Sequence, residues 1–331
     1  MAKLYVMVGI PGSGKSHESR RIAEEMQAKI YSSDIFRAQL KLDASVDKQN
    51  DDLFDMMYAK IREELDAGND IVLDATNTYA KYRRKFFKAI EGSGAQVIAV
   101  VVMRQYENCL KANAARKHPI REEVIRTMYE GYDLPYYDEP WSEIRFVYPD
   151  NDEKALGYFM DFKEGYRNFP QDNPHHLEML GDHLEMVYNE VKDEEEALSA
   201  AAVIHDCGKP FCKTFYNYKN ELTEIAHYTY HDHVGSYMAM FFDFGEDKDR
   251  SFKHYVAYLI RMHMRPFDWE ASERRWNRDQ REMKAEWIEH LKKLHAADLK
   301  CSISDPEELK KLNTINWKKN NPLWEGLIFV N

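Results

Sequence analysis

Short apolar segments alternate with charged segments along the first 150 residues. The apolar segments are rich in β-branched residues and read LYVMVG (4–9), AKIYSS (28–33), DIVLDAT (70–76), QVIAVVVM (96–103) and EIRFVY (143–148). Between them lie charged segments of helical pattern, such as HESRRIAEEMQ (17–27) and DLFDMMYAKIREELDAG (52–68). Alternation of this kind predicts an α/β domain over residues 1–150, a parallel sheet with helices on both faces.

The pattern changes near PDNDEKALG, residues 149–157, where turn-forming and charged residues gather. Beyond this segment the strand pattern fades and long helical patterns dominate, so we expect a second, all-α domain over residues 155–331. Eleven of the 13 histidines fall at or beyond residue 175. This shift suggests that the second domain uses imidazole groups in its chemistry.

Composition narrows the class of protein. The net charge of −11 argues against a surface coated in basic residues, although the local run KYRRKFFK (81–88) leaves open either a confined phosphate-binding face or a solvated helix face. No apolar run has the length of a membrane span, and the first strand enters a glycine-rich loop directly, so we expect neither a membrane anchor nor a signal peptide. Four cysteines without paired spacing fit a reducing cytoplasm.

A phosphate-binding motif follows the first strand. Residues 9–16, GIPGSGKS, fit G-x-x-x-x-G-K-[ST], with Gly9, Gly12, Ser13, Gly14, Lys15 and Ser16 as the candidate nucleotide-binding residues. Glycines allow backbone N–H groups to surround the β-phosphate, Lys15 can reach the β- and γ-phosphates, and the Ser16 hydroxyl can bind Mg²⁺. The motif predicts ATP or another nucleoside triphosphate, with Mg²⁺, as cofactor.

Polar residues near the ends of later strands extend this candidate site. Asp34 and Arg37 follow the second strand, where Asp34 can accept the proton of an attacking hydroxyl and Arg37 can hold a neighbouring phosphate or sugar. A helix N-cap followed by a surface arginine is the structural alternative for this pair. Asp74 ends the third strand and is a candidate to orient Mg²⁺, and Arg116 lies in a basic segment that could close over the triphosphate.

Residues 1–150 resemble the bacteriophage-type P-loop polynucleotide kinase family in GIPGSGKS, in the D-x-x-R of Asp34 and Arg37, and in the segment from Arg116 through HPIREEVIRTMY. The resemblance implies that Asp34 is the general base for a 5′-hydroxyl, that Arg37 contacts the acceptor phosphate, and that Arg116 neutralises the transferring phosphoryl group. Here Ala75 separates Asp74 from Thr-Asn, whereas the phage pattern has the acid directly before them. The same spacing occurs in other small P-loop kinases, so the motif defines the identity of the phosphate acceptor less closely than that of the donor.

Six histidines and aspartates in the second half could hold metal ions. Each lies in a segment of helical pattern, so a helical bundle could direct all six inward: His183, His205, Asp206, His231, His263 and Asp298. Mixed imidazole and carboxylate ligands suit divalent transition metals, and two such ions can share a hydroxide and bind a phosphate. His233 competes with His231 as a ligand. His175 and His176 could assist substrate, but they follow a proline in a loop, where surface positions are common.

This spacing, with Lys209 completing H-D-x-G-K, resembles the HD phosphohydrolase superfamily over about residues 170–305. The resemblance implies that the six residues bind two metal ions and that Lys209 lies near the substrate phosphate. It favours His231 over His233, because residues 231–235 fit the family's H-x-x-V-G sequence.

The two resemblances together predict a bifunctional end-healing enzyme. The kinase would phosphorylate 5′-hydroxyl ends of RNA or DNA, RNA being favoured, and the HD domain would remove 2′,3′-cyclic or 3′-phosphates. No ligase motif is present, so sealing would need a separate RNA ligase, in the cytoplasm of a bacterium or of a phage-infected cell. Two alternatives stay open: a small-molecule or nucleoside kinase fused to a nucleotide phosphohydrolase, and a regulatory module that senses nucleotides.

Overall fold

The computed structural model describes residues 1–40, 47–174 and 176–302, and the chain divides into two compact units, Met1–Asp152 and Glu153–Asn331. This division falls within the segment 149–157, where the sequence changes character. His175, one of the two loop histidines, lies outside the described residues. Within those residues, no helix combines the length and the apolar character needed to cross a membrane.

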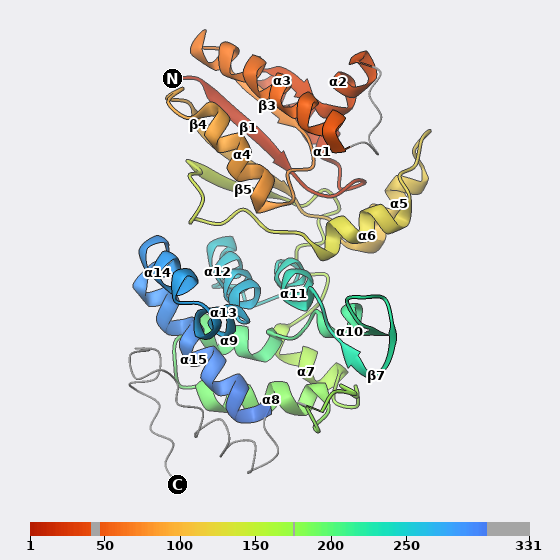
Figure 1. The fold of residues 1–331 in the computed structure, drawn as a ribbon, viewed down its shortest axis with the longest axis vertical. Coiled ribbons are helices and arrows are strands. Elements are labelled where there is room, and N and C mark those ends of the chain that lie inside the picture. The colour runs from red at the N-terminus through yellow and green to blue at the C-terminus, as the bar shows by residue number, and fades with distance from the viewer. Residues whose placement is uncertain (41–46, 175, 303–331) are drawn as a thin grey trace. The chain divides into compact units, whose positions relative to one another are not determined.

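The first unit is built on one sheet of five parallel strands (Figure 1). The strands lie in the order β2-β3-β1-β4-β5, and their bounds are β1 (Lys3–Val8), β2 (Lys29–Ser32), β3 (Ile71–Asp74), β4 (Gln96–Val102) and β5 (Glu143–Val147). All four neighbouring pairs are parallel, which confirms the predicted α/β architecture. The carboxyl ends of the strands therefore meet at one edge of the sheet, where ligands bind in folds of this type.

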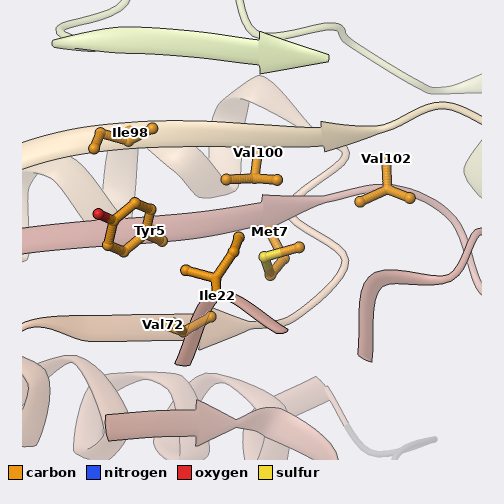
Figure 2. Packing of buried hydrophobic residues seen from close by; sticks show 7 residues of the cluster. All are labelled: Tyr5, Met7, Ile22, Val72, Ile98, Val100 and Val102. Carbon is orange, nitrogen blue, oxygen red and sulfur yellow. The ribbon is translucent and has the colours of Figure 1, made fainter. Parts of the chain in front are cut away.

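Apolar side chains fill both faces of the sheet. In β1, Tyr5 and Met7 point to the face that Ile22 covers, and Figure 2 shows them packed with residues of β3 and β4. The alternate residues Leu4 and Val6 point to the other face and are also fully buried. Burial of successive residues explains why the central strands β1, β3 and β4 read as continuous apolar segments, whereas the edge strands β2 and β5 are more exposed.

Helices connect the strands, because parallel neighbours require crossovers. Their bounds are α1 (Lys15–Met26), α2 (Ser33–Leu40), α3 (Asp47–Asp66), α4 (Ala80–Ile90), α5 (Tyr106–Ala114) and α6 (Glu122–Glu130). The buried Arg83 of α4 forms two-pronged hydrogen bonds with Glu139 and also donates to three backbone carbonyls. This arginine fastens the segment before β5 to the start of α4.

The second unit is mainly helical. Its longer helices are α8 (Leu180–Val191), α9 (Glu196–Ile204), α11 (His231–Ala239), α12 (Arg250–Met262), α14 (Glu273–Glu282) and α15 (Ala285–Ser302), with shorter segments η1 (Phe159–Asp161), α7 (Phe162–Gly165), α10 (Lys209–Cys212) and α13 (Arg265–Ala271). Helix α8 packs against α9 and α15, while α12 packs against α9 and α11. The four cysteines are buried, and none of them forms a disulfide among the described residues.

The prediction of an all-α second domain was wrong in one segment. Strands β6 (Thr214–Tyr216) and β7 (Leu222–His227) form an antiparallel hairpin. Its turn contains Asn220 with a φ of 61°, and the Asn217 side chain accepts hydrogen bonds from the backbone of the turn. Two short β-prone runs around an Asn-rich turn favour a hairpin over a helix. The prediction missed this pattern because the segment is polar and was interpreted as a loop.

Candidate functional site

The glycine-rich loop lies between β1 and the first residue of α1, Lys15. Gly9, Gly12 and Gly14 all have positive φ, at 159°, 86° and 102°. A Cβ on Gly12 would lie only 2.2 Å from the Cys109 carbonyl oxygen, so this position needs glycine for space as well as for conformation. Because α1 starts here, the first N–H groups of the helix lack intrahelical partners and face the loop.

Two polar side chains in the loop are buried and suited to an anion. The Lys15 ammonium donates to the Ile10 carbonyl at 2.9 Å, and burial lowers the pKa of Lys15 to about 8 against the opposing effect of Asp74. The buried Ser13 hydroxyl has no hydrogen-bond partner among the described residues. A phosphate group would supply acceptors to both, so the loop fits the nucleotide that its sequence predicts.

The other predicted residues of the first unit lie around the carboxyl edge of the sheet. Asp34 is exposed at the start of α2, with its carboxylate 3.2 Å from the Arg37 guanidinium and 3.9 Å from that of Arg116. Asp74 ends β3 and accepts a hydrogen bond from Ser16, while burial raises its pKa. Asp34, Asp74 and Arg116 all interact electrostatically with Lys15. The structure thus brings the predicted set together.

This arrangement suits phosphoryl transfer. Lys15 and the loop would bind the donor phosphates, and Ser16 with Asp74 would hold Mg²⁺, which supplies charge neutralisation to the phosphates. The exposed Asp34 carboxylate is accessible to an acceptor hydroxyl and can take its proton. Arg116 comes from the segment between α5 and α6 and interacts electrostatically with Lys15, so it could neutralise charge on a transferring phosphoryl group.

The second unit brings the six predicted metal ligands into one buried centre. Two groups of three ligand atoms each lie within 4.8 Å of one another: His183, His205 and Asp298, and Asp206, His231 and His263. Asp206 connects them, because its Oδ2 lies 3.6 and 3.4 Å from the Nε2 atoms of the first two histidines, and its Oδ1 lies 3.3 and 3.9 Å from those of the other two.

Backbone carbonyls set the protonation of three of these histidines. The Nδ1 atoms of His205, His231 and His263 lie 2.9, 2.7 and 2.6 Å from the carbonyl oxygen three residues earlier in each case. Only a protonated Nδ1 can bond to a carbonyl, so each Nε2 presents its lone pair in the neutral ring. His205 and His263 stand just after α9 and α12, where the last carbonyls of a helix have no intrahelical partner.

A carboxylate, rather than a carbonyl, lies beside the Nδ1 atom of the fourth histidine. His183 Nδ1 lies 3.2 Å from Glu178 Oε1, and its Nε2 lies 3.2 Å from Asp298 Oδ1. Burial lowers the pKa of His183, but Asp298 and Glu178 outweigh it and raise the pKa to about 9. In the other group, burial and the neighbouring histidines lower the pKa of His263 to about 4.

The donor set fits divalent transition metals. Nε2 atoms face each other at 3.3 Å between His183 and His205 and at 3.2 Å between His231 and His263. In the second pair both Nδ1 atoms bond to backbone carbonyls, so the two Nε2 lone pairs repel at this separation unless a cation lies beside them. Although burial opposes ionisation, nearby cationic groups hold the pKa of Asp206 and of Asp298 well below the usual range, so both supply anionic oxygens. Bound metal would supply a Lewis acid and an activated water.

Gly208 allows the two ligand groups to come together. A Cβ at this residue would lie 2.1 Å from the His231 carbonyl oxygen and 2.8 Å from the Gly235 backbone nitrogen. The turn after α9 therefore packs directly on the start of α11. The close contact of Gly208 with the backbone of His231 and Gly235 thus holds His231 near Asp206.

Lys209 lies beside the centre among residues that the sequence did not identify as a group. Its ammonium lies 2.6 Å from Asp206 Oδ2, 2.8 Å from Gln171 Oε1 and 3.2 Å from His176 Nε2. His176 in turn lies 3.0 Å from Glu178 through Nδ1. Gln171 and Glu178 are ordinary polar residues in a loop, and no local pattern distinguishes them.

Two sequence predictions are refined by these positions. Only three of the six candidate ligands lie inside helices, whereas His205, Asp206 and His263 follow helix ends, where carbonyls are available to orient them. His233 lies outside both groups, with its Nε2 3.9 Å from Asp232 Oδ2. Two further groups of possible ligands were not predicted: His176, Glu178 and His183, which shares His183 with the centre, and Glu195, Glu286 and His290, which shares no residue with it.

Comparisons with known proteins bear on the first unit. Residues 4–135 match a family model described as an AAA domain. An L-seryl-tRNA(Sec) kinase from Methanococcus maripaludis is 27% identical over 145 residues, which cover 42% of this chain and 55% of that protein. The chain thus matches about half the length of this curated relative.

Several solved structures resemble about half of the chain. A gluconokinase from Sinorhizobium meliloti 1021 is 17% identical, with a TM-score of 0.34 over 45% of this chain and 83% of that one. Chaetomium thermophilum Kti12 in complex with ADP-AlF3 is 18% identical, with a TM-score of 0.38 over 45% and 91%. A Pnkp1/Rnl/Hen1 complex is 19% identical, with a TM-score of 0.33 over 52% and 51%. The first unit is thus similar to an AAA domain over residues 4–135 and to part of an L-seryl-tRNA(Sec) kinase.

Proposed function

We propose that this protein heals nucleic-acid ends, with RNA as the favoured substrate. The first unit would transfer phosphate from ATP to a 5′-hydroxyl, and the second would use two divalent metal ions to remove a 2′,3′-cyclic or 3′-phosphate. The two reactions act on opposite ends of one break. Ribonucleases that leave cyclic phosphate and 5′-hydroxyl ends would generate such substrates, and a separate ligase would be needed to seal them.

One observation carries the phosphoesterase half. Asp206 directs its two oxygens to different pairs of histidine nitrogens, and the Lys209 ammonium lies 2.6 Å from one of those oxygens. Two ions sharing a carboxylate can bind both a phosphate and the attacking water, which is the usual role of paired metals in phosphoester hydrolysis. Lys209 would then bind a phosphate oxygen.

Exposure of Asp34 supports the kinase half. Its side chain keeps 72% of its accessible surface, although it lies beside Arg37 and Arg116 at the ligand-binding edge of the sheet. A large acceptor, such as the end of a polynucleotide, can therefore reach it. The matched relative is named for a tRNA-linked acceptor, and RNA-borne hydroxyls are the acceptor class that we propose for this chain.

The test uses end-labelled oligonucleotides with either a 5′-hydroxyl or a 3′-phosphate, in RNA and DNA forms. We expect Lys15→Ala to lose phosphorylation and keep phosphate removal, and Asp206→Ala to show the reverse. Chelation of the wild type should likewise abolish phosphate removal. A transition metal should then restore phosphate removal better than Mg²⁺, which prefers all-oxygen ligands. Wild-type protein that acts on neither end would refute the proposal.

A metabolic alternative rests on the acidic net charge of −11. In this alternative, a small-molecule or nucleoside kinase is joined to a nucleotide phosphohydrolase. Its substrates would bind with weak salt dependence, whereas a polynucleotide that contacts several basic residues loses affinity steeply as salt rises. Nucleosides turned over more efficiently than any oligonucleotide would favour the alternative.

A further inference from the structure

The basic run KYRRKFFK forms most of α4, and four of its five cations lie on the outward face of this helix, whereas Arg83 is buried. Phe86 and Ile90 are buried against the first unit, whereas Lys81, Arg84, Lys85 and Lys88 are exposed. Figure 1 shows α4 running across the sheet of the first unit. We call these four cations and the exposed Tyr82 the α4 basic face.

Three of the four cations have no carboxylate partner within ion-pair distance in the part of the chain that the structure describes. Lys85 pairs with Asp51 and Asp55 of α3, but no such pair involves Lys81, Arg84 or Lys88. The chain as a whole carries a net charge of −11. An isolated cluster of positive charge on an acidic protein is complementary to a polyanion.

Aromatic rings accompany the charges at the first turn of α4. The Lys81 ammonium lies 4.7 Å from the centre of the Tyr82 ring and 5.8 Å from that of Tyr79. The two rings meet edge to face at 5.7 Å, and Tyr82 is 50% exposed. Basic side chains that follow a phosphate backbone, beside aromatic rings on which bases stack, are the usual means of binding single-stranded nucleic acid.

The direction of α4 relates this face to the candidate kinase site. The helix begins six residues after Asp74, which ends β3 at the ligand-binding edge, and it ends near Gln96, where β4 starts at the opposite edge. Lys81 and Tyr82 therefore lie towards the edge that carries Asp34. Lys88 lies about 10 Å further along the helix axis, at 1.5 Å per residue.

We propose that the α4 basic face binds the phosphates of a single-stranded polynucleotide whose 5′-hydroxyl lies at Asp34. The inference rests on the proposed kinase function and adds to it the path of the acceptor strand. A nucleoside 3′-phosphate would fill the acceptor site without reaching this face. A strand of several nucleotides would reach it and gain affinity from it.

The test compares two triple variants of the full chain. In the first, Lys81, Arg84 and Lys88 are all changed to Gln. In the control, the exposed cations Arg21, Lys29 and Arg145 are changed to Gln, which removes the same charge from other elements of the same unit. Binding to a 5′-hydroxyl single strand of about 12 nucleotides is measured by fluorescence anisotropy over a range of salt concentrations. Phosphorylation is measured with that strand and with a nucleoside 3′-phosphate, after thermal denaturation has shown that both variants fold.

We expect the α4 variant to bind the strand at least about tenfold more weakly, with a salt slope that falls by about 2, since each phosphate contact contributes about 0.7 for single strands. Its KM for the strand should rise, while kinetics with the nucleoside 3′-phosphate stay as in the wild type. An α4 variant that behaves like the control overturns the inference. The proposed kinase function would still stand in that case if the wild type phosphorylates the strand. Binding that depends on α4 in a protein that phosphorylates no 5′-hydroxyl strand supports the binding surface and refutes the kinase proposal.

Discussion

Replacing Gly208 with Ala tests the packing that unites the two candidate ligand groups. Gly208 has a φ of −78°, so alanine fits its backbone conformation and the substitution acts through the added Cβ alone. That atom would lie 2.1 Å from the His231 carbonyl oxygen, whereas ordinary contacts begin near 3.4 Å. The start of α11 must therefore move by about 1.3 Å, the difference between these two distances.

Such a movement exceeds what a metal site tolerates. Ligand positions are set to within about 0.2 Å, so the group formed by Asp206, His231 and His263 should lose its ion. A misplacement of about 1 Å costs on the order of 10² in rate, and overpacking costs about 1–3 kcal/mol of stability. We expect a folded Gly208→Ala protein with about half the bound metal, phosphatase activity reduced by about 10² or more, and an unchanged kinase.

The assay combines metal analysis with hydrolysis of a 3′-phosphate oligonucleotide. Gly165→Ala is the matched control, because a Cβ at this exposed glycine of the same unit would meet no atom within 4 Å. The control should keep wild-type metal content and activity. Full metal occupancy with undiminished hydrolysis in Gly208→Ala would refute the role assigned to this contact.

Three further predictions follow from single contacts. Glu178→Gln weakens the orientation of His183 and should lower metal affinity by about 10- to 100-fold without unfolding the protein, as metal titration would reveal; unchanged affinity would count against it. Arg83→Met leaves the Glu139 carboxylate without its buried partner and should cost about 3–5 kcal/mol in denaturant unfolding, and a loss below about 1 kcal/mol would contradict this. Asp34→Asn should keep ATP binding but slow phosphorylation by about 10² to 10⁴, measured as turnover with a 5′-hydroxyl strand; near-normal turnover would leave Asp34 as a capping residue.

Much of the first unit could be predicted because its signals are local. The phosphate loop is one contiguous segment whose glycines, lysine and serine act through backbone geometry at fixed spacing, and the loop has the positive φ angles that this use requires. Continuous apolar segments predicted the central strands β1, β3 and β4, which are buried on both faces, and short β-prone segments predicted the edge strands β2 and β5. The roles of Asp34 and Asp74 remain predictions, although both lie at the expected edge of the sheet.

The second unit shows where local patterns are insufficient. The hairpin β6–β7 was missed because its two strands are short and its turn is polar, so no apolar run indicated strands in this segment. His233 competed with His231 as a ligand, and only the family resemblance favoured His231. Two residues along a helix differ by about 200° in direction, so only one of them can face Asp206. His231 is the one that does so, because its Nε2 lies 3.3 Å from Asp206 Oδ1.

The kinds of chemistry available could be predicted from residue types and spacing: a loop that fits phosphates, and histidines and aspartates at spacings typical of metal ligands. Which groups surround them depends on how distant segments of the chain pack. Glu178, Gln171 and His176 reach the centre because a loop folds back beside α8 and α10, and the Gly208 contact depends on a packed neighbour more than 20 residues away in the chain. Contacts of this kind are set by packing between distant segments, and packing leaves no periodic trace in the sequence.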